Sequence, residues 1–282
     1  MIKTSTQVKA LIRNMAKSDS DKAQLLIRNY GMERFLERVS LSRYKDNFIL
    51  KGGMLVSSMV GLDHRATMDI DTTIRNMPLG VPEAEAIVEE IAAVLVEDNV
   101  RFEIKDVSTI MDEAEYGGVR LSMDARLDTM RIPLKIDIST GDTITPAAIS
   151  YRYKLMFEDR YIDLWAYNLE TVLAEKIETV LSRSTANTRL RDFYDIHILQ
   201  KTDMTIDTGI LTAALRATCR KRESESVLPR YSAIINDLAA SAGKRFPVSF
   251  PCHSQKQRLN CPQGKKRKAR GAVAEDGHRA PR

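Results

Sequence analysis

Four stretches between residues 66 and 138 alternate apolar and polar side chains with a period of two. Successive side chains of a β-strand point to opposite faces of a sheet, so the alternation is typical of a sheet with one buried face and one polar face. The pattern therefore predicts a β-sheet as the core of the chain. The stretches are 66–75, 100–105, 119–127 and 131–138.

Helical patterns precede, interrupt and follow these stretches. Apolar residues recur every three or four positions in the first 40 residues, and 82–98 is an amphipathic stretch that starts with proline and acidic residues. Asn168 can cap a third helical stretch, whose apolar stripe begins at Leu169. We predict an α+β fold, in which a sheet with flanking helices is followed by a helical C-terminal domain. The predicted parts are N-terminal helices in 1–45, a β-sheet core in 46–166, a helical domain in 167–245 and a tail in 246–282.

The formal net charge of +5 comes from the tail. Residues 244–282 contain eleven Lys and Arg and two acidic residues, whereas the other 243 residues contain 32 basic and 36 acidic ones, a net charge of −4. The tail has little apolar content and no periodicity, which predicts disorder. Two alternatives are an electrostatic arm for RNA or DNA, and a metal site at Cys252, His253 and Cys261 that lacks ordinary zinc spacing.

The sequence contains no run of about 18 apolar residues, so it predicts no membrane span. The first 17 residues lack the apolar core of a secretory signal. The three cysteines are too few and too scattered for a disulfide framework. These features favour the cytoplasm.

The stretch 66–75 places Asp69 and Asp71 two positions apart, on the same face of the predicted strand and about 6.6 Å from each other along it. Two such carboxylates repel each other unless they contact water or a cation. A solvated edge strand is one interpretation, and a site for Mg²⁺, which prefers oxygen ligands, is the other. Asp137, on the polar side of another predicted strand, can supply the third carboxylate of a two-metal site.

A glycine pair, Gly52-Gly53, follows an apolar run upstream of the two carboxylates. Glycine lets a backbone approach a phosphate closely, and the amides at a helix start favour anions. A plain tight turn is the alternative for a glycine pair alone. Together with the D-x-D sequence, the pair favours a site for a nucleotide.

The glycine pair and the D-x-D sequence together resemble the first motif of nucleotidyltransferases of the DNA polymerase β type. In these enzymes a Gly-Gly or Gly-Ser turn precedes a helix, and the following strand of a mixed sheet presents D-x-D to two magnesium ions. From about residue 20 to 240, the chain resembles more narrowly the AbiE-type (AbiEii/AbiGii) toxins of bacterial abortive-infection and toxin–antitoxin systems. The blocks that carry this resemblance are LKGG, R-x-T-x-D-I-D, I-D-I-S-x-G-D-x-I-x-P, and A-E-K followed by R-x-R-D-F-Y-D.

The resemblance implies roles for individual residues. Asp69, Asp71 and Asp137 would hold two Mg²⁺ ions, with Mn²⁺ as a substitute, and Gly52 and Gly53 would position the triphosphate.

Lys176 and Asp192 match the later blocks. Lys176 lies on the apolar stripe of its helix, where a lysine either snorkels to water or points into a cleft, and the resemblance matches it to a lysine that meets the triphosphate. Asp192 would orient the acceptor hydroxyl or Lys176, unless it makes a surface pair with a neighbouring arginine.

Arg65 matches the first block and could bind a phosphate oxygen, although a capping or loop role fits its position equally well. Many relatives have Ser or Thr directly after the glycines, where this chain has Met54. A hydroxyl contact to the triphosphate would then be lost, or supplied by Ser57 or Ser58.

The resemblance thus implies a metal-dependent enzyme that transfers a nucleoside monophosphate from an NTP to an acceptor hydroxyl. The implied acceptor is the 3′ end of tRNA, with Arg120 and Arg126 as candidate RNA contacts, and the implied partner is an antitoxin. The alternatives are a protein or small-molecule acceptor, and a module that binds NTP or an antitoxin without catalysis.

Overall fold

The computed structural model describes residues 2–110, 117–202 and 204–245. The chain divides into two units, Met1–Leu238 and Ala239–Arg282. The first contains the sheet and helices α1 to α7, and the described part of the second is the end of helix α8. The predicted tail, including its basic run and the Cys252, His253 and Cys261 set, lies outside the described residues.

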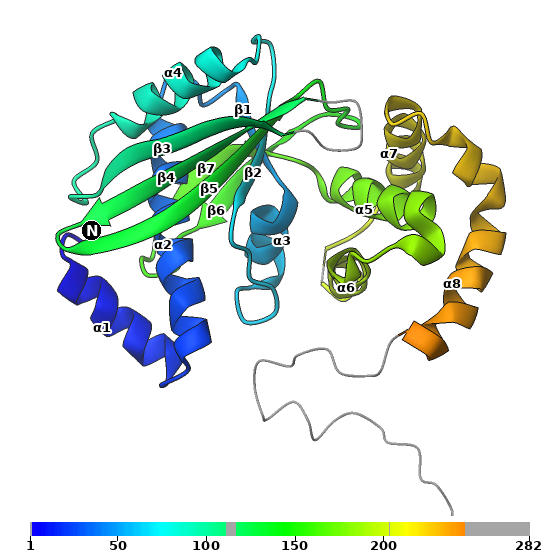
Figure 1. Ribbon diagram of the computed structural model, residues 1–282, viewed down its shortest axis with the longest axis horizontal. Coiled ribbons are helices and arrows are strands. Elements are labelled where there is room, and N and C mark those ends of the chain that lie inside the picture. Colours follow the sequence, from blue (N-terminus) through cyan, green and yellow to red (C-terminus); the bar gives the residue numbers. More distant parts are fainter. Residues whose placement is uncertain (1, 111–116, 203, 246–282) are drawn as a thin grey trace, which may run out of the picture. The chain divides into compact units, whose positions relative to one another are not determined.

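A seven-stranded mixed sheet forms the centre of the first unit, with the strand order β3-β4-β5-β2-β1-β7-β6 (Figure 1). Strand β2 is parallel to β5, and β1 is parallel to β7, while the other neighbours are antiparallel. The structure confirms the predicted α+β fold. The strands are β1 Phe48–Lys51, β2 Ile70–Ile74, β3 Arg101–Ile110, β4 Gly118–Leu127, β5 Met130–Thr140, β6 Ile149–Lys154 and β7 Tyr161–Ala166.

Helices precede the sheet, connect its strands and follow it. Asn168 caps α5 as expected, because its side chain accepts a hydrogen bond from the amide of Thr171 at 3.1 Å. The helices are α1 Ser5–Ala16, α2 Ser20–Leu41, α3 Gly52–Val60, α4 Val81–Ala92, α5 Leu169–Arg183, η1 Ser184–Ala186, α6 Leu190–Leu199, α7 Thr208–Lys221, η2 Glu225–Arg230 and α8 Tyr231–Arg245.

The apolar face of the sheet is covered by α2 and α4, which contact β5 and β3 (Figure 1). Along β5, buried residues alternate with exposed ones from Met130 to Ile138, as the sequence predicted. A Cβ on Gly31 of α2 would lie 3.0 Å from a methyl carbon of Ile132, so a glycine is needed where α2 crosses β5. The opposite face of the sheet is therefore left to carry the polar residues.

Two predicted boundaries differ from the structure. Helix α4 ends at Ala92 rather than at residue 98, because Asp98 is drawn into a buried ion pair with Arg38 of α2, at 2.8 Å. Leu95, in the stretch predicted to be helical, is exposed. Strand β3 continues to Ile110, five residues beyond the predicted end, as the partner of β4 across a register shift.

Helix α2 is buried around most of its circumference between residues 29 and 39, and it buries charged residues there. These side chains pair with residues far along the chain: Arg34 contacts Glu158 at 3.0 Å, and both oxygens of Glu33 accept hydrogen bonds from the amide of Met156 at 3.1 Å. The pairs attach the β6–β7 segment to α2.

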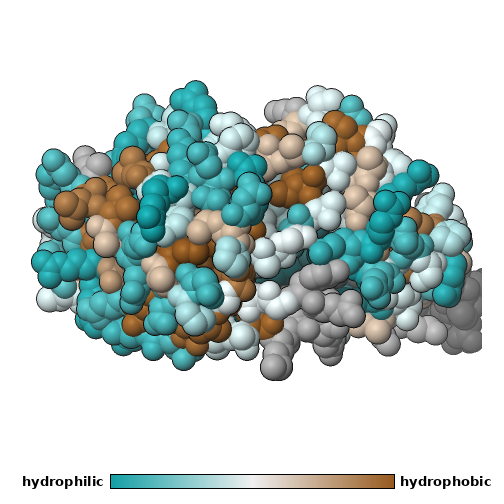
Figure 2. All heavy atoms as spheres, turned by 90° about the horizontal axis from the view of Figure 1, so that it is seen from above, coloured by the Kyte–Doolittle hydropathy of each residue, from teal (hydrophilic) through white to brown (hydrophobic). Residues whose placement is uncertain are grey.

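The surface in view in Figure 2 carries several separate hydrophobic patches among hydrophilic side chains. Within the described ranges, none of the helices combines the length and apolar character that a bilayer crossing requires.

Candidate active site

A row of charged residues crosses the polar face of the sheet from β1 to β4. Lys51 lies opposite Asp71 in the β1–β2 pair, Asp71 opposite Asp137 in the β2–β5 pair, and Asp137 opposite Arg120 in the β5–β4 pair. Directly opposed residues share a face, so the four side chains form one line with two carboxylates in the middle and a cation at each end.

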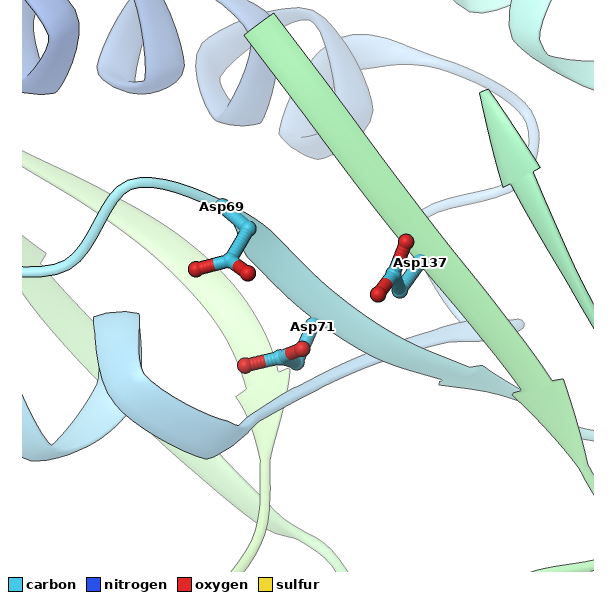
Figure 3. A group of neighbouring side chains, drawn as sticks. All are labelled: Asp69, Asp71 and Asp137. Atoms are coloured by element: carbon cyan, nitrogen blue, oxygen red, sulfur yellow. The ribbon is translucent and has the colours of Figure 1, made fainter. Parts of the chain in front are cut away.

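Asp69 joins the two central carboxylates from the residue just before β2, since the strand begins at Ile70. One oxygen each of Asp69, Asp71 and Asp137 lies within 4.8 Å of the other two. The three carboxylates gather on the same side of β2 and β5 (Figure 3). The hydroxyl of Thr67 donates to Oδ1 of Asp69 at 3.0 Å, which fixes this carboxylate although it lies outside the strand.

The carboxyl group of Asp71 has a raised pKa. Burial, followed by the charge of Asp69, raises its pKa to about 6, and Asp137 adds to the rise. The amide of Gly53 and the charge of Lys51 act in the opposite direction. Carboxylates that crowd in this way favour a bound cation, because a cation removes the repulsion between them.

The glycine pair begins α3 directly above Asp71. The amide of Gly53 donates to Oδ2 of Asp71 at 3.1 Å. Gly52 has a positive φ of 65°, and a Cβ there would lie 2.0 Å from the same oxygen, so any other residue would collide with the carboxylate. The pair therefore seats the helix start on Asp71, which is a more specific role than a tight turn.

Asp137 is bound by Arg120. Nε and Nη2 of Arg120 donate to the two oxygens of Asp137, at 2.8 and 2.6 Å. Arg126, the second candidate RNA contact, lies elsewhere on β4 and pairs with Glu103 at 2.8 Å. Both arginines thus have acidic partners, and Arg120 belongs to the row of charged residues.

A second cluster joins α5, α6 and the segment before β2. Nζ of Lys176 contacts Oδ2 of Asp195 at 2.7 Å and Oδ1 of Asp192 at 3.3 Å. Nε of Arg65 donates to Oδ1 of Asp195 at 2.7 Å. Lys176 therefore points inward to α6, and Asp192 pairs with this lysine rather than with a neighbouring arginine.

Oδ2 of Asp192 is buried and has no hydrogen-bond partner among the residues that the structure describes. A buried acceptor of this kind ordinarily binds a donor, so this oxygen is open to a water molecule or a ligand group.

The two serines of α3 do not face the carboxylates. Ser57 is buried and donates its hydroxyl to the carbonyl of Arg65, while Ser58 donates to the carbonyl of Leu55 at 2.8 Å. The contact of Ser57 or Ser58 with the triphosphate therefore stays a prediction, and in this structure Ser57 fixes the backbone that carries Arg65.

The sequence interpretation gave no role to three residues near these clusters, Asp195, Asp142 and Lys51. Asp195 is completely buried and binds both Arg65 and Lys176. Its position three residues after Asp192, on the same face of a helix, was the available signal. Asp142 accepts hydrogen bonds from Lys51, in the row, and from the hydroxyl of Tyr167 at 2.7 Å.

A cleft of about 1190 Å³ lies over the row of charged residues. Asp69, Asp71 and Asp137 line it together with Lys51 and Arg120. Its walls come from the β3–β4 hairpin and from α5 and α7, and they carry both acidic and basic residues. The charged residues that α5, α7 and the segments directly after them contribute include Glu175, Glu178, Arg183, Arg189, Lys221 and Arg222.

The donor set fits divalent magnesium. Three carboxylates supply oxygen ligands, they converge without a basic residue between Asp69 and Asp71, and they face a cleft that can admit water and a nucleotide. Asp69, Asp71 and Asp137 are the residues that could hold the ions.

A mixed sheet that presents three carboxylates beneath a helix start, with a lysine and an aspartate from following helices nearby, defines a protein of the nucleotidyltransferase class. A family model described as nucleotidyl transferase AbiEii toxin, type IV TA system, matches residues 34–249. The chain belongs to this family. Membership supports an enzyme of nucleotidyl transfer in a toxin–antitoxin context, with an NTP substrate and an antitoxin partner.

Several solved structures resemble this one at low sequence identity. JHP933 from Helicobacter pylori has 14% sequence identity and a TM-score of 0.45, covering 78% of this chain and 96% of that chain. A second H. pylori protein has the same identity and TM-score, covering 85% and 99% of the two chains. An antigenic nucleotidyltransferase-like protein from Paracoccidioides brasiliensis has 12% identity and a TM-score of 0.39, covering 84% and 95%. No curated protein matches the sequence.

Proposed function

We propose that this protein transfers a nucleoside monophosphate from an NTP to a hydroxyl at the 3′ end of a tRNA, in a magnesium-dependent reaction in the cytoplasm. The observation that carries the proposal is the convergence of Asp69, Asp71 and Asp137 within 4.8 Å in a cleft. Blocking the 3′ end of tRNA would prevent aminoacylation, which suits a toxin that an antitoxin controls.

The three carboxylates would hold two Mg²⁺ ions, and Mn²⁺ would serve as a substitute. When bound, the ions would lower the pKa of the acceptor hydroxyl and neutralise charge on the triphosphate. The amide of Gly53 keeps Asp71 in place for this task.

Lys176, Arg65 and the glycine pair would bind the phosphates. Asp195 holds Lys176 and Arg65 side by side, each at 2.7 Å, so two cations are fixed near the start of α3. A Cβ on Gly53 would lie 3.1 Å from Nη2 of Arg65, which places this guanidinium against the helix start. Fixed cations and amides stabilise charge on a transferring phosphoryl group.

The acceptor would lie beside Asp192. The buried oxygen Oδ2 of this residue, which has no partner in the described part of the chain, would accept the hydrogen bond and then the proton of the acceptor hydroxyl. A cleft of about 1190 Å³ exceeds what a small ligand needs, and Arg183, Arg189 and Lys221 on its walls suit a polyanion such as RNA.

The test is incubation of the protein with each labelled NTP, first with total RNA and then with total cellular protein. Label in tRNA that requires Mg²⁺ is expected, with a loss of at least about 1000-fold in Asp69→Ala and Lys176→Ala. The matched control is Glu89→Gln, an exposed acid of α4 on the other side of the sheet. If only protein is labelled, the acceptor is a protein and not tRNA. If the protein binds NTP but transfers nothing, it is a binding module and not an enzyme.

A further inference from the structure

Lys51 is the end of the row of charged residues on β1, one strand away from Asp71. It is the last residue of β1, lies opposite Asp71 in the β1–β2 register, and immediately precedes the first turn of α3. Its side chain is 18% exposed, and the residue lines the same cleft as the three acids. One cation therefore stands next to the proposed metal ligands on the side opposite Asp137.

The ammonium group of Lys51 contacts residues that lie outside the row of charged residues. It donates to Oδ2 of Asp142, and it lies 5.8 Å from the centre of the Tyr167 ring. Asp142 is itself held by the hydroxyls of Tyr167, at 2.7 Å, and Ser139, at 2.9 Å. These contacts fix the direction of the lysine side chain.

This arrangement is not explained by stability. A partly buried ion pair loses solvation that its attraction recovers poorly, and apolar residues of similar size would stabilise the same position as well. An ammonium has three donors, and in the part of the chain that the structure describes Asp142 takes one of them. A lysine that lines the cleft can direct its other donors to an anion.

We propose that Lys51 binds the polyphosphate of the nucleotide, and that Asp142 and Tyr167 are positioning residues that act through it. The ligand class is a nucleoside triphosphate, whose β- and γ-phosphates suit a compact positive charge. The inference rests on the proposed function and adds a residue to it.

The role follows from where charge appears during transfer. The acceptor oxygen forms a bond to the α-phosphorus, and the bond from that phosphorus to the bridging oxygen breaks. Its electron pair leaves with pyrophosphate, while the proton of the acceptor passes to Asp192. Lys51 balances the negative charge that pyrophosphate gains, so its loss affects both binding and turnover.

The experiment measures binding rather than transfer. The four nucleoside α,β-methylene triphosphates and the corresponding monophosphates are titrated calorimetrically in Mg²⁺ into the full chain and into Lys51→Met/Asp142→Asn, which removes both charges of the pair. Lys51→Gln, which keeps a hydrogen bond to Asp142, is the second variant in case the double variant does not fold. The control is Lys105→Met, an ion-paired lysine of β3 that does not line the cleft.

We expect both charge-removing variants to lower the preference for triphosphate over monophosphate at least 10-fold, and Lys51→Arg and the control to keep it within about 3-fold. A folded variant that retains the wild-type preference would overturn the role of Lys51 alone, provided that the wild-type protein binds and transfers nucleotide. A wild-type protein that binds none of the four triphosphates would overturn the proposed function together with this inference.

Discussion

The guanidinium of Arg120 binds both carboxylate oxygens of Asp137, with N–O distances of 2.8 and 2.6 Å. A cation from β4 therefore already occupies the third proposed metal ligand, and a divalent ion must share this carboxylate with it or displace it. Arg120→Gln is expected to raise the affinity for Mn²⁺ by about 3- to 10-fold, because one positive charge near the ion is removed. Titration of Mn²⁺ followed by electron paramagnetic resonance measures this.

Arg126→Gln is the matched control for that substitution, since Arg126 lies on the same strand but pairs with Glu103 away from the three acids. An unchanged or lower Mn²⁺ affinity in Arg120→Gln would mean that the guanidinium supports the metal site instead of competing for it.

Gly52 is expected to tolerate no side chain. In Gly52→Ala the new Cβ would lie 2.0 Å from Oδ2 of Asp71, and the residue would keep a φ of 65° that alanine disfavours. We expect a loss of about 2–4 kcal/mol of unfolding free energy or, if the chain adjusts, loss of Mg²⁺-induced stabilisation. Thermal unfolding with and without Mg²⁺ distinguishes a loss of stability from a loss of Mg²⁺-induced stabilisation. Gly117→Ala should change neither, because nothing lies within 4 Å of a Cβ at this glycine.

Substitution of Asp195 should mainly lower stability, whereas substitution of Asp192 should mainly lower the transfer activity. Asp195→Asn leaves Arg65 and Lys176 without the buried charge that both contact, so it should cost about 3 kcal/mol of unfolding free energy. Asp192→Asn should change stability by less than about 1 kcal/mol and reduce transfer, since its free oxygen is proposed to serve the acceptor. Urea unfolding and the transfer assay, applied to both variants, check this. Equal losses of unfolding free energy in the two variants would mean that both residues have the same structural role, which would contradict the role in transfer proposed for Asp192.

Glu33 should make stability depend on pH. Burial raises the pKa of its carboxyl from 4.5 to about 7, although the amide of Met156 lowers it, as do Arg34 and Asn29. Glu158 adds a small rise. A raised pKa means that the folded state favours the protonated form, so the contribution of Glu33 to stability is full below pH 4.5 and is lost as pH rises through 7.

The measurement for Glu33 is urea unfolding between pH 5 and 8. Glu33→Gln stays neutral, and its carbonyl can accept the hydrogen bonds from Asn29 and Met156. The free energy of unfolding of Glu33→Gln, relative to that of the wild-type protein, should therefore increase with pH by up to about 3 kcal/mol. A difference that does not vary with pH would contradict the assigned pKa.

The regular parts of the fold were predictable because their signals are local. The period of two in β4 and β5 follows from one buried face, and Asn168 caps α5 through a hydrogen bond three residues away. The end of α4 was not predictable, since it depends on Arg38, a residue 60 positions before Asp98. The same holds for the buried charges of α2, whose partners lie on distant segments. The division into domains stays a prediction.

The candidate site likewise contains residues that could be predicted from local sequence and residues that could not. Asp69 and Asp71 could be assigned from their spacing, and Asp137 from its face of a strand, although their roles as metal ligands remain predictions. Lys51 lies in the LKGG block, but no role could be assigned to it from the sequence, because its place beside Asp71 follows from the pairing of β1 with β2. Asp195 was visible as a neighbour of Asp192, but its two cationic partners come from other elements.

The alignment of Lys51, Asp71, Asp137 and Arg120 in one line depends on the register of four strands. Inserting or deleting a single residue within any of these strands would turn its member of the line to the opposite face. Homologous chains should therefore vary in length between these strands and keep a constant number of residues inside them.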